Sequence, residues 1–368
     1  MKLKVGEIRS SERVEKMYHW KGAPYEIGLS HGKELKEQVH HLYSSWYDGW
    51  VKTNGVSEVE KNIRKNLPRY EVFFQNDAPE VLEEIKGIAD GSGMTYKDIL
   101  LLNVLEEIRL EMFYRFNPFG CTQIAVTDDI TSIHRLLIGK NEDGGDWNRG
   151  QYVHAKIEPK NGHKFIMLLQ PGRVAAYIGF SETGLCFSQS SAGVENDIGF
   201  GYPRLILFRL MMERCSTVED ALDFMSAHNY AVAGINLMLA DQKSNVVLIE
   251  KTHSHQAERY PEDGILIGVN VFRSSSMRPL WTKKMISNIK DSVLRIERIL
   301  ELLEPQKGKI DHETLKNILR DHKNGENSIC SHGGWRPTGS SYIYDPKSIK
   351  IQISEGRPCQ NEYHEYKV

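Results

Sequence analysis

A cysteine at position 121 has the sequence setting of a catalytic nucleophile. Cys121 follows Gly120 in the stretch FNPFGCTQIAV, residues 116–126, and opens a short run that alternates apolar and polar residues. A thiol nucleophile needs a base, a donor for the oxyanion and a rigid element that holds it. If the chain cuts itself between Gly120 and Cys121, the freed α-amine can be that base, because its reference pKa is about 8. A structural interpretation also stands, in which Gly120 makes a turn and Cys121 is a small core residue that begins a strand.

Glycine at position 120 suits such a cut on conformational grounds. Without a side chain, this residue can adopt the strained backbone conformations that bring the Cys121 thiol onto the preceding carbonyl. Taken alone, the Gly-Cys pair favours the structural interpretation, so the surrounding chain has to supply further evidence.

The remaining cysteines and histidines show no metal-binding pattern. Four cysteines are widely spaced and form no C-x-x-C pair, namely Cys186, Cys215, Cys330 and Cys359. This spacing indicates neither a zinc ribbon nor a disulfide framework. His253 and His255 share one face of a predicted strand but lack a nearby third ligand, and no H-E-x-x-H or P-loop spacing occurs. We therefore predict no metal and no cofactor.

Helix signals dominate the chain ahead of Gly120. Pro24 opens a predicted helical stretch that ends at Gly55, since proline suits a first turn and glycine suits a helix end. A second helix is predicted over residues 78–93. A third follows Thr95, which has capping-box spacing to Asp98. We expect this whole first part to be helical.

Beyond Gly120 the pattern changes to short β-type runs. They occupy residues 121–126, 133–141, 152–158, 164–170, 184–190, 235–241, 245–251 and 264–270. Helices are predicted over residues 201–227, 285–303 and 311–321, and residues 340–354 close the chain as a hairpin. Blocks of strands that alternate with helices favour an α+β fold, with antiparallel sheets packed against helices, over a doubly wound parallel sheet.

Charge and hydropathy exclude several classes of protein. The chain has 368 residues with 47 basic and 49 acidic side chains, a formal net charge of −2. This balance offers no electrostatic footprint for nucleic acid or for an anionic membrane surface. The first residues lack the apolar core of a signal peptide, and no apolar run is long enough to span a bilayer. We expect a cytoplasmic protein without nucleic-acid or membrane partners.

Three motifs in order along the chain resemble one enzyme family. The run GCTQIAV, followed about twenty residues later by GKNEDGGDW, resembles the acyl-coenzyme A:6-aminopenicillanate acyltransferase family of N-terminal nucleophile hydrolases. YEIGLSHG, residues 25–32, is similar to the Tyr-x-x-Gly-x-x-His-Gly signature near the start of that family's precursors. EEIKGIADGSGMTYKDILLLN is similar to its pre-cleavage helices. The resemblance implies a four-layer αββα fold and an autocatalytic cut, which would leave a helical chain, residues 1–120, associated with a catalytic chain, residues 121–368.

The resemblance also implies roles for three residues. Cys121 matches the nucleophile. Asp143, in GKNED, matches the aspartate that holds the nucleophile's amine, where a carboxylate fixes the orientation of an ammonium group. Asn270, in LIGVNVF, matches the asparagine that donates to the oxyanion. By themselves, Asp143 reads as a hairpin-end solvent residue and Asn270 as an ordinary residue at a strand end.

The chain departs from the bile-salt hydrolase branch of these enzymes at several positions. Lys140 stands where that branch has an arginine. An asparagine that follows the branch's Gly-Leu strand has Gln189, Ser190 or Ser191 as candidates here. Arg336 is the nearest candidate for a basic residue near the C-terminal strands. These departures concern the oxyanion hole and the substrate pocket more than the nucleophile.

The sequence thus predicts an enzyme that transfers acyl groups through a Cys121 thioester. We expect hydrolysis of a small N-acyl amide or peptide, with transfer to amines as a side activity, because no basic cluster is present for the phosphates of coenzyme A. Three alternatives stand beside this hypothesis. They are a coenzyme A-dependent N-acyltransferase that uses a coenzyme A thioester and an amine acceptor, a bile-salt or penicillin type of amidase, and a non-catalytic binding protein on the same fold.

Overall fold

Two β-sheets form the centre of the computed structural model, which describes residues 16–110, 120–144, 151–192, 197, 199–231, 234–281, 283–333 and 336–368. One sheet has eight strands in the order β1-β4-β5-β6-β7-β8-β9-β10, and the other has six in the order β11-β2-β3-β12-β13-β14. The strands of the first sheet are β1 (Tyr18–Gly22), β4 (Val153–Pro159), β5 (Phe165–Leu169), β6 (Ile178–Ser181), β7 (Cys186–Ala192), β8 (Gly234–Ala240), β9 (Val246–Lys251) and β10 (Gln256–Arg259). Those of the second are β2 (Cys121–Val126), β3 (Leu137–Asp143), β11 (Ile265–Gly268), β12 (Thr338–Asp345), β13 (Lys350–Glu355) and β14 (His364–Lys367).

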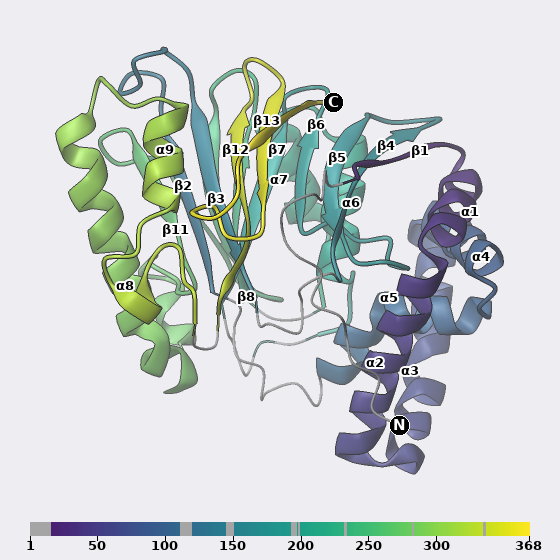
Figure 1. The fold of residues 1–368 in the computed structure, drawn as a ribbon. Coiled ribbons are helices and arrows are strands. Elements are labelled where there is room, and N and C mark those ends of the chain that lie inside the picture. Colours follow the sequence, from purple (N-terminus) through teal and green to yellow (C-terminus); the bar gives the residue numbers. More distant parts are fainter. Residues whose placement is uncertain are drawn as a thin grey trace, which may run out of the picture.

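Helices cover the outer face of each sheet (Figure 1). On the six-stranded sheet, α8 (Lys283–Leu303) and α9 (His312–Leu319) share one apolar cluster with the strands, in which Ile299 and Leu315 join Ile124 and Ile343. The eight-stranded sheet carries α6 (Arg204–Arg214) and α7 (Val218–Ala227). Every residue of the inner strand β8 is buried, as expected for a strand covered on both faces. The layer order is helix, sheet, sheet, helix, which confirms the expected αββα fold.

The helical first part of the chain lies beside the eight-stranded sheet, on the right in Figure 1. It comprises α1 (Pro24–Glu34), α2 (Lys36–Asn54), α3 (Val56–Asp77), α4 (Pro79–Ser92) and α5 (Tyr96–Leu110). The predicted start at Pro24 and stop at Gly55 are confirmed, although the stretch breaks into two helices at Leu35. The Thr95 hydroxyl accepts the N–H of Asp98 at 3.2 Å, so the predicted cap is present.

Helix α3 agrees with the expected helical character of this first part. It runs through Pro68, a residue that normally interrupts a helix, and it is held by a buried face that includes Leu67 and Phe74. The prediction that the whole part is helical is wrong at β1, which pairs in parallel with β4 at the edge of the eight-stranded sheet. A five-residue strand is stable only through such pairing, so its own sequence carries a weak signal.

The YEIGLSHG motif joins α1 closely to α4. A Cβ atom on Gly28 would lie 2.0 Å from the carbonyl oxygen of Glu84, and one on Gly87 would lie 2.1 Å from that of Tyr25. Backbone therefore meets backbone at this helix crossing, and only glycine leaves room for it. Gly28 of the motif and Gly87 of α4 therefore have a structural role.

The histidine of the same motif connects the helical part to the rest of the chain. His31 is fully buried and its Nε2 accepts the N–H of Gly172 at 2.8 Å, while its ring stacks on Trp20 at 4.3 Å between centroids. Burial lowers the pKa of His31 to about 3, so the imidazole is neutral at neutral pH and keeps a lone pair for this bond.

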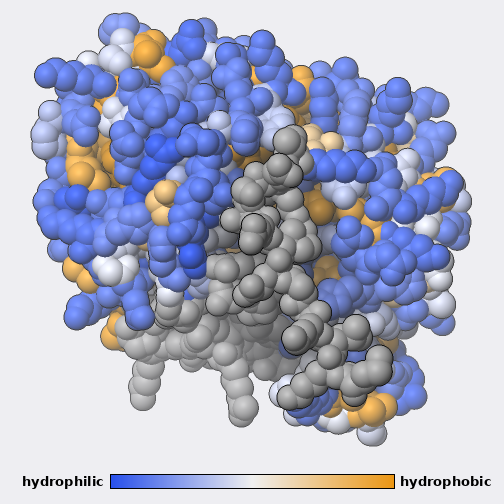
Figure 2. Space-filling view, viewed as in Figure 1, coloured by the Kyte–Doolittle hydropathy of each residue, from blue (hydrophilic) through white to orange (hydrophobic). Residues whose placement is uncertain are grey.

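Hydrophilic side chains cover most of the described surface on the face shown in Figure 2, and apolar ones are scattered in small groups. Within the described ranges, no helix combines the length and the apolar character needed to cross a membrane.

We predict that Gly28→Ala destabilises the protein, because the added methyl group has to push two helix backbones apart. The expected loss is about 1–3 kcal/mol or more in the free energy of unfolding, the usual cost of overpacking. Gly49→Ala in α2 is the matched control: a Cβ there meets nothing within 4 Å, and the change should stabilise the helix by about 0.5–1 kcal/mol. Denaturant melts of both variants check this, and equal effects of the two changes would contradict it.

Candidate active site

Cys121 is the first residue of β2, an inner strand between β11 and β3. Its side chain is 1 % exposed, and across the antiparallel pair it faces Glu142 on β3. Two residues along β2, Gln123 faces the other sheet, where its Nε2 donates to Ser190 Oγ at 2.9 Å and its Oε1 accepts from Ser188 Oγ at 2.6 Å. These polar contacts between the sheets fix the strand that carries the thiol.

Charged groups surround the thiol of Cys121. Its Sγ lies 3.7 Å from Glu142 Oε1, and Lys140 Nζ lies 3.0 Å from the other carboxylate oxygen of Glu142. Lys140 is fully buried and also donates to the backbone carbonyl of Gln189. Burial, together with the adjacent Glu142 carboxylate, raises the pKa of the Cys121 thiol to about 12. In the continuous chain the thiol is therefore protonated at neutral pH, and a neighbouring acceptor is in place for its proton.

The nitrogen of Cys121 is held by Asn270, which follows β11. The Cys121 N–H donates to Asn270 Oδ1 at 2.9 Å, and Asn270 Nδ2 donates to the carbonyl of Ser191 at 2.9 Å. The fold thus brings Asn270 to Cys121. Its side-chain oxygen accepts from the Cys121 nitrogen, whereas the sequence assigned this residue to the oxyanion and Asp143 to the amine.

Arg295 on α8 is a site residue that the sequence did not reveal. Its guanidinium donates to the carbonyl of Cys121, and it donates to Thr122 Oγ1 at 3.0 Å and to Asn270 Oδ1 at 2.9 Å. Asp291, one turn earlier, accepts from it at 2.7 Å. Asp291, Arg295 and Ile299 are spaced four residues apart, so they lie on one face of α8. An acidic and a basic residue aligned with a buried apolar residue were therefore the signal in the sequence that could have indicated a buried ion pair.

Arg336 lies between two carboxylates and completes this buried network. It donates to Asp143 Oδ2 at 2.9 Å, to Asp291 Oδ1 at 2.6 Å and to the carbonyl of Ser328 at 2.9 Å. Thr338 Oγ1 donates to the second oxygen of Asp143 at 2.6 Å. Asp143 is 1 % exposed, so reading it as a solvent residue at a hairpin end is wrong. Burial raises the pKa of Asp143 to about 6, although Arg336 acts in the opposite direction.

Gly120 is required because of how it packs. A Cβ atom at this position would lie 1.8 Å from Cδ of Arg336, so the glycine makes room for the arginine side chain. The arginine that pairs with Asp143 therefore packs directly on the Gly120 backbone.

The other expected residues divide between the site and the sheet interface. Lys140 lies at the thiol, and Arg336 binds Asp143, so both belong to the site. Ser191 contributes its backbone carbonyl to Asn270, whereas the Ser190 hydroxyl is bonded within the sheet interface. The side chain of Gln189 points to the opposite face of β7 from Ser190, because side chains alternate along a strand.

Together these groups can support acyl chemistry at Cys121. The thiol has an acidic neighbour in Glu142, the nitrogen has an acceptor in Asn270, and the carbonyl of the same residue has a cationic donor in Arg295. Two carboxylates, Asp143 and Asp291, balance the charges of the two guanidinium groups. A buried arrangement of this kind holds its dipoles fixed while bonds change, which is the usual basis of electrostatic catalysis.

Comparisons with known proteins indicate the family of the chain. Residues 131–360 match the model of the family described as acyl-coenzyme A:6-aminopenicillanic acid acyl-transferase. An uncharacterized protein of Archaeoglobus fulgidus is 23 % identical over 82 % of this chain and 57 % of its own length, and protein dcd1A of Dictyostelium discoideum is 24 % identical over 55 % and 50 %. The chain thus spans little more than half the length of these curated relatives.

Matches among solved structures include two at low sequence identity. The N-acylethanolamine-hydrolyzing acid amidase ortholog of Caenorhabditis elegans is 16 % identical, with a TM-score of 0.45 over 62 % of this chain and 93 % of its own. Penicillin V acylase from Agrobacterium tumefaciens is 11 % identical, with a TM-score of 0.42 over 64 % and 83 %. The family model alone covers most of the chain, from the loop after β2 to the turn after β13. The chain belongs to the acyl-coenzyme A:6-aminopenicillanic acid acyl-transferase family.

Proposed function

We propose that the chain cuts itself between Gly120 and Cys121 and then hydrolyses a small N-acyl amide or peptide through a thioester on Cys121. The observation that carries this proposal is the environment of Cys121. It is a buried residue at the start of an inner strand, and separate polar groups contact its thiol, its nitrogen and its carbonyl. A thiol that served only to fill the core would not need these three sets of partners.

The cut begins with attack of the Cys121 sulfur on the carbonyl carbon of Gly120. The thiol proton passes to Glu142, whose Oε1 lies 3.7 Å from Sγ. The Gly120–Cys121 C–N bond then breaks, the Cys121 nitrogen takes a proton, and a thioester joins Gly120 to the sulfur. Water hydrolyses this thioester, which leaves a carboxylate on Gly120 and a free thiol and amine on Cys121.

Turnover uses the amine that the cut creates. This amine accepts the thiol proton, and the thiolate attacks the acyl carbonyl of the substrate. The C–N bond of the substrate then breaks, the ammonium group of Cys121 returns its proton to the leaving amine, and the acyl group stays on the sulfur as a thioester. Asp143 provides the buried negative charge that orients the ammonium form, and Asn270 stays beside the nitrogen as it does in the continuous chain. Because the Asn270 amide nitrogen carries two hydrogens, it can donate to the oxyanion as well as to Ser191. Water then releases the acyl group as a carboxylic acid.

The two products of the cut are expected to stay together. The strand β1 extends the sheet that contains β4, and His31 accepts the backbone N–H of Gly172. Tyr202 near α6 donates to Asp77 on α3, and Arg209 lies 3.4 Å from Glu84 on α4. These contacts do not depend on an intact Gly120–Cys121 bond.

Hydrolysis is favoured over coenzyme A-dependent transfer because of how the nearby cations are used. Among the described residues, Arg295 and Arg336 pair with Asp291 and Asp143 beside the nucleophile. They are therefore committed to the network and are poor candidates for binding the phosphates of coenzyme A. The preference for hydrolysis is therefore proposed from these ion pairs. It is not taken from the family, whose name includes an acyl-coenzyme A donor.

We predict that Cys121→Ala abolishes both cutting and turnover. Intact mass of the wild-type protein should show two fragments that sum to the precursor plus one water, whereas the variant should stay a single chain of 42.2 kDa. Cys186→Ala and Cys215→Ala, at buried thiols away from β2, are the controls and should be cut normally. A stable uncut wild-type chain with full activity would refute the proposed maturation, although not the thioester.

Three further variants separate the roles at the site. Glu142→Gln should slow the cut by at least about tenfold, because general-base catalysis contributes factors of about 10²–10⁴. Asp143→Asn should impair both cutting and turnover, since it leaves Arg336 with one charged partner fewer. Asn270→Ala should lower kcat by about 10²–10³-fold, the usual cost of a lost oxyanion donor. Mass spectrometry follows the cut and an activated acyl ester follows turnover. A variant that matches wild type in both assays would remove its residue from the site.

The acceptor is tested by a partition experiment. An activated acyl donor is supplied in water with a graded series of amines, and the ratio of amide to acid is measured. A hydrolase should give ratios that rise in proportion to amine concentration and basicity. A built acceptor site would instead saturate at low amine concentration, because positioning can be worth an effective molarity of about 10⁵ M or more. Saturation with one amine would exclude the hydrolase assignment.

A further inference from the structure

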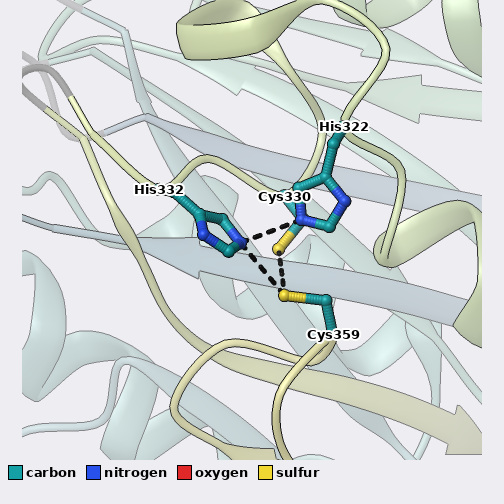
Figure 3. A group of neighbouring side chains, drawn as sticks. All are labelled: His322, Cys330, His332 and Cys359. Carbon is teal, nitrogen blue, oxygen red and sulfur yellow. Dashed lines mark hydrogen bonds between the residues drawn. The ribbon is translucent and has the colours of Figure 1, made fainter.

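Four metal-ligating side chains converge away from Cys121, near the C-terminal strands (Figure 3). They are His322, Cys330, His332 and Cys359, and their ligand atoms all lie within 4.8 Å of one another. The two Sγ atoms are 3.7 Å apart, the two Nε2 atoms are 2.9 Å apart, and Nε2 of His332 is 3.0 Å from Sγ of Cys359. Among the described residues this is the group that combines two thiols with two imidazoles in one place.

We propose that these four residues bind one Zn²⁺ ion. In a tetrahedral site with Zn–S bonds of about 2.3 Å, two sulfurs lie about 3.8 Å apart, close to the separation found here. The contacts of the imidazole nitrogens are a few tenths of an ångström shorter than a tetrahedron requires, so small side-chain movements would admit the ion. Two thiolates and two imidazoles are a ligand set that selects zinc over magnesium or calcium.

The burial of the group suits a metal that is loaded from solvent and then retained. Cys330 is fully buried and Cys359 is partly buried, whereas His322 and His332 are exposed. Zinc binds the thiolate forms of Cys330 and Cys359, so loading of the ion would release the protons of both thiols.

The position of the group indicates a structural role. His322 follows α9, Cys330 and His332 lie a few residues before Arg336, and Cys359 lies in the turn after β13. The N–H of Ser331 donates to Thr338 Oγ1 at 3.0 Å, and the carbonyl of Ser328 accepts from Arg336 at 2.9 Å. A metal here would fix the residues that contact Arg336 and Thr338, the two partners of Asp143. Four protein ligands also leave no open position for a catalytic water.

This proposal departs from the prediction of no metal made from the sequence. The ligands follow the spacing H-x₇-C-x-H-x₂₆-C, in which no C-x-x-C pair occurs. Only the return of the chain from β13 to the end of α9 brings Cys359 to the other three. The same proximity also defines the rival outcome, a disulfide between Cys330 and Cys359, which are free cysteines in this structure.

The test uses the full chain, purified without chelator, loaded with ZnCl₂ and dialysed. Elemental analysis should give one zinc per chain, and X-ray absorption should show two sulfurs at about 2.3 Å and two nitrogens at about 2.0 Å. Cobalt should give the charge-transfer bands of thiolate-bound tetrahedral Co²⁺. A chelator should lower the melting temperature of the zinc-loaded protein. None of these measurements depends on cutting or turnover, so they stand apart from the proposed function.

Matched variants assign the ligands. Cys359→Ser should lose stoichiometric zinc and the response to chelator, while Cys215→Ala, at a buried thiol on the other side of the fold, should keep both. If Cys359→Ser does not fold, His322→Ala at the exposed rim should fold and bind zinc at least about tenfold more weakly. The proposal is overturned if reduced wild type binds no zinc in a competition titration, if its mass shows a Cys330–Cys359 disulfide that persists with added zinc, or if Cys359→Ser binds zinc like wild type.

Discussion

The rest of the site depends on the ion pairs that the buried guanidinium group of Arg336 makes. This group is buried, it bridges Asp143 and Asp291, and it packs against the backbone of Gly120. An isolated charge in such a place would cost several kcal/mol, so both carboxylates and the Ser328 carbonyl are needed to keep it there. The pairing joins β3, α8 and the segment before β12, and it places them against Gly120, the residue that precedes Cys121.

A second charge network shares Asp291 with the first and contacts Cys121. Asp291 also accepts from Arg295, and Arg295 donates to the carbonyl of Cys121 and to Asn270. One aspartate on α8 therefore links the two arginines and sets the distance between the group that binds Asp143 and the group that binds Cys121. Because each member has more than one partner, removal of one is expected to affect the others, and single substitutions will not add independently.

Different residues contact the thiol and the nitrogen of Cys121. Glu142 and Lys140 on β3 contact the thiol, whereas Asn270 contacts the nitrogen. Under the proposed function, the cut changes the nitrogen from a peptide N–H into an amine without moving the strand, since the sheet interface at Gln123 holds β2 in place. The precursor state would thus already contain the arrangement that turnover requires, and the helical part would serve the fold both before and after the cut.

The sequence alone predicted many of the helices and strands and supported the hypothesis that Cys121 is a nucleophile. The tertiary structure decided which side chains contact one another at the site. Strand β2 and the capped start of α5 were predicted because alternation and capping act between near neighbours in the chain. β1 could not be predicted in the same way, since a short edge strand owes its existence to β4.

The same distinction holds within the site. Cys121, Asp143 and Asn270 were selected by motif, and the fold brings Asn270 to Cys121 and Asp143 to Arg336. Arg295 comes from a helix far along the chain, and the local helix pattern around it does not indicate that it contacts Cys121. The space that the Arg336 side chain takes beside Gly120 likewise depends on the tertiary structure. Local patterns in a sequence report local conformation and burial. The pairing of buried charges depends on which distant segments meet, and only the packing of the layers settles that.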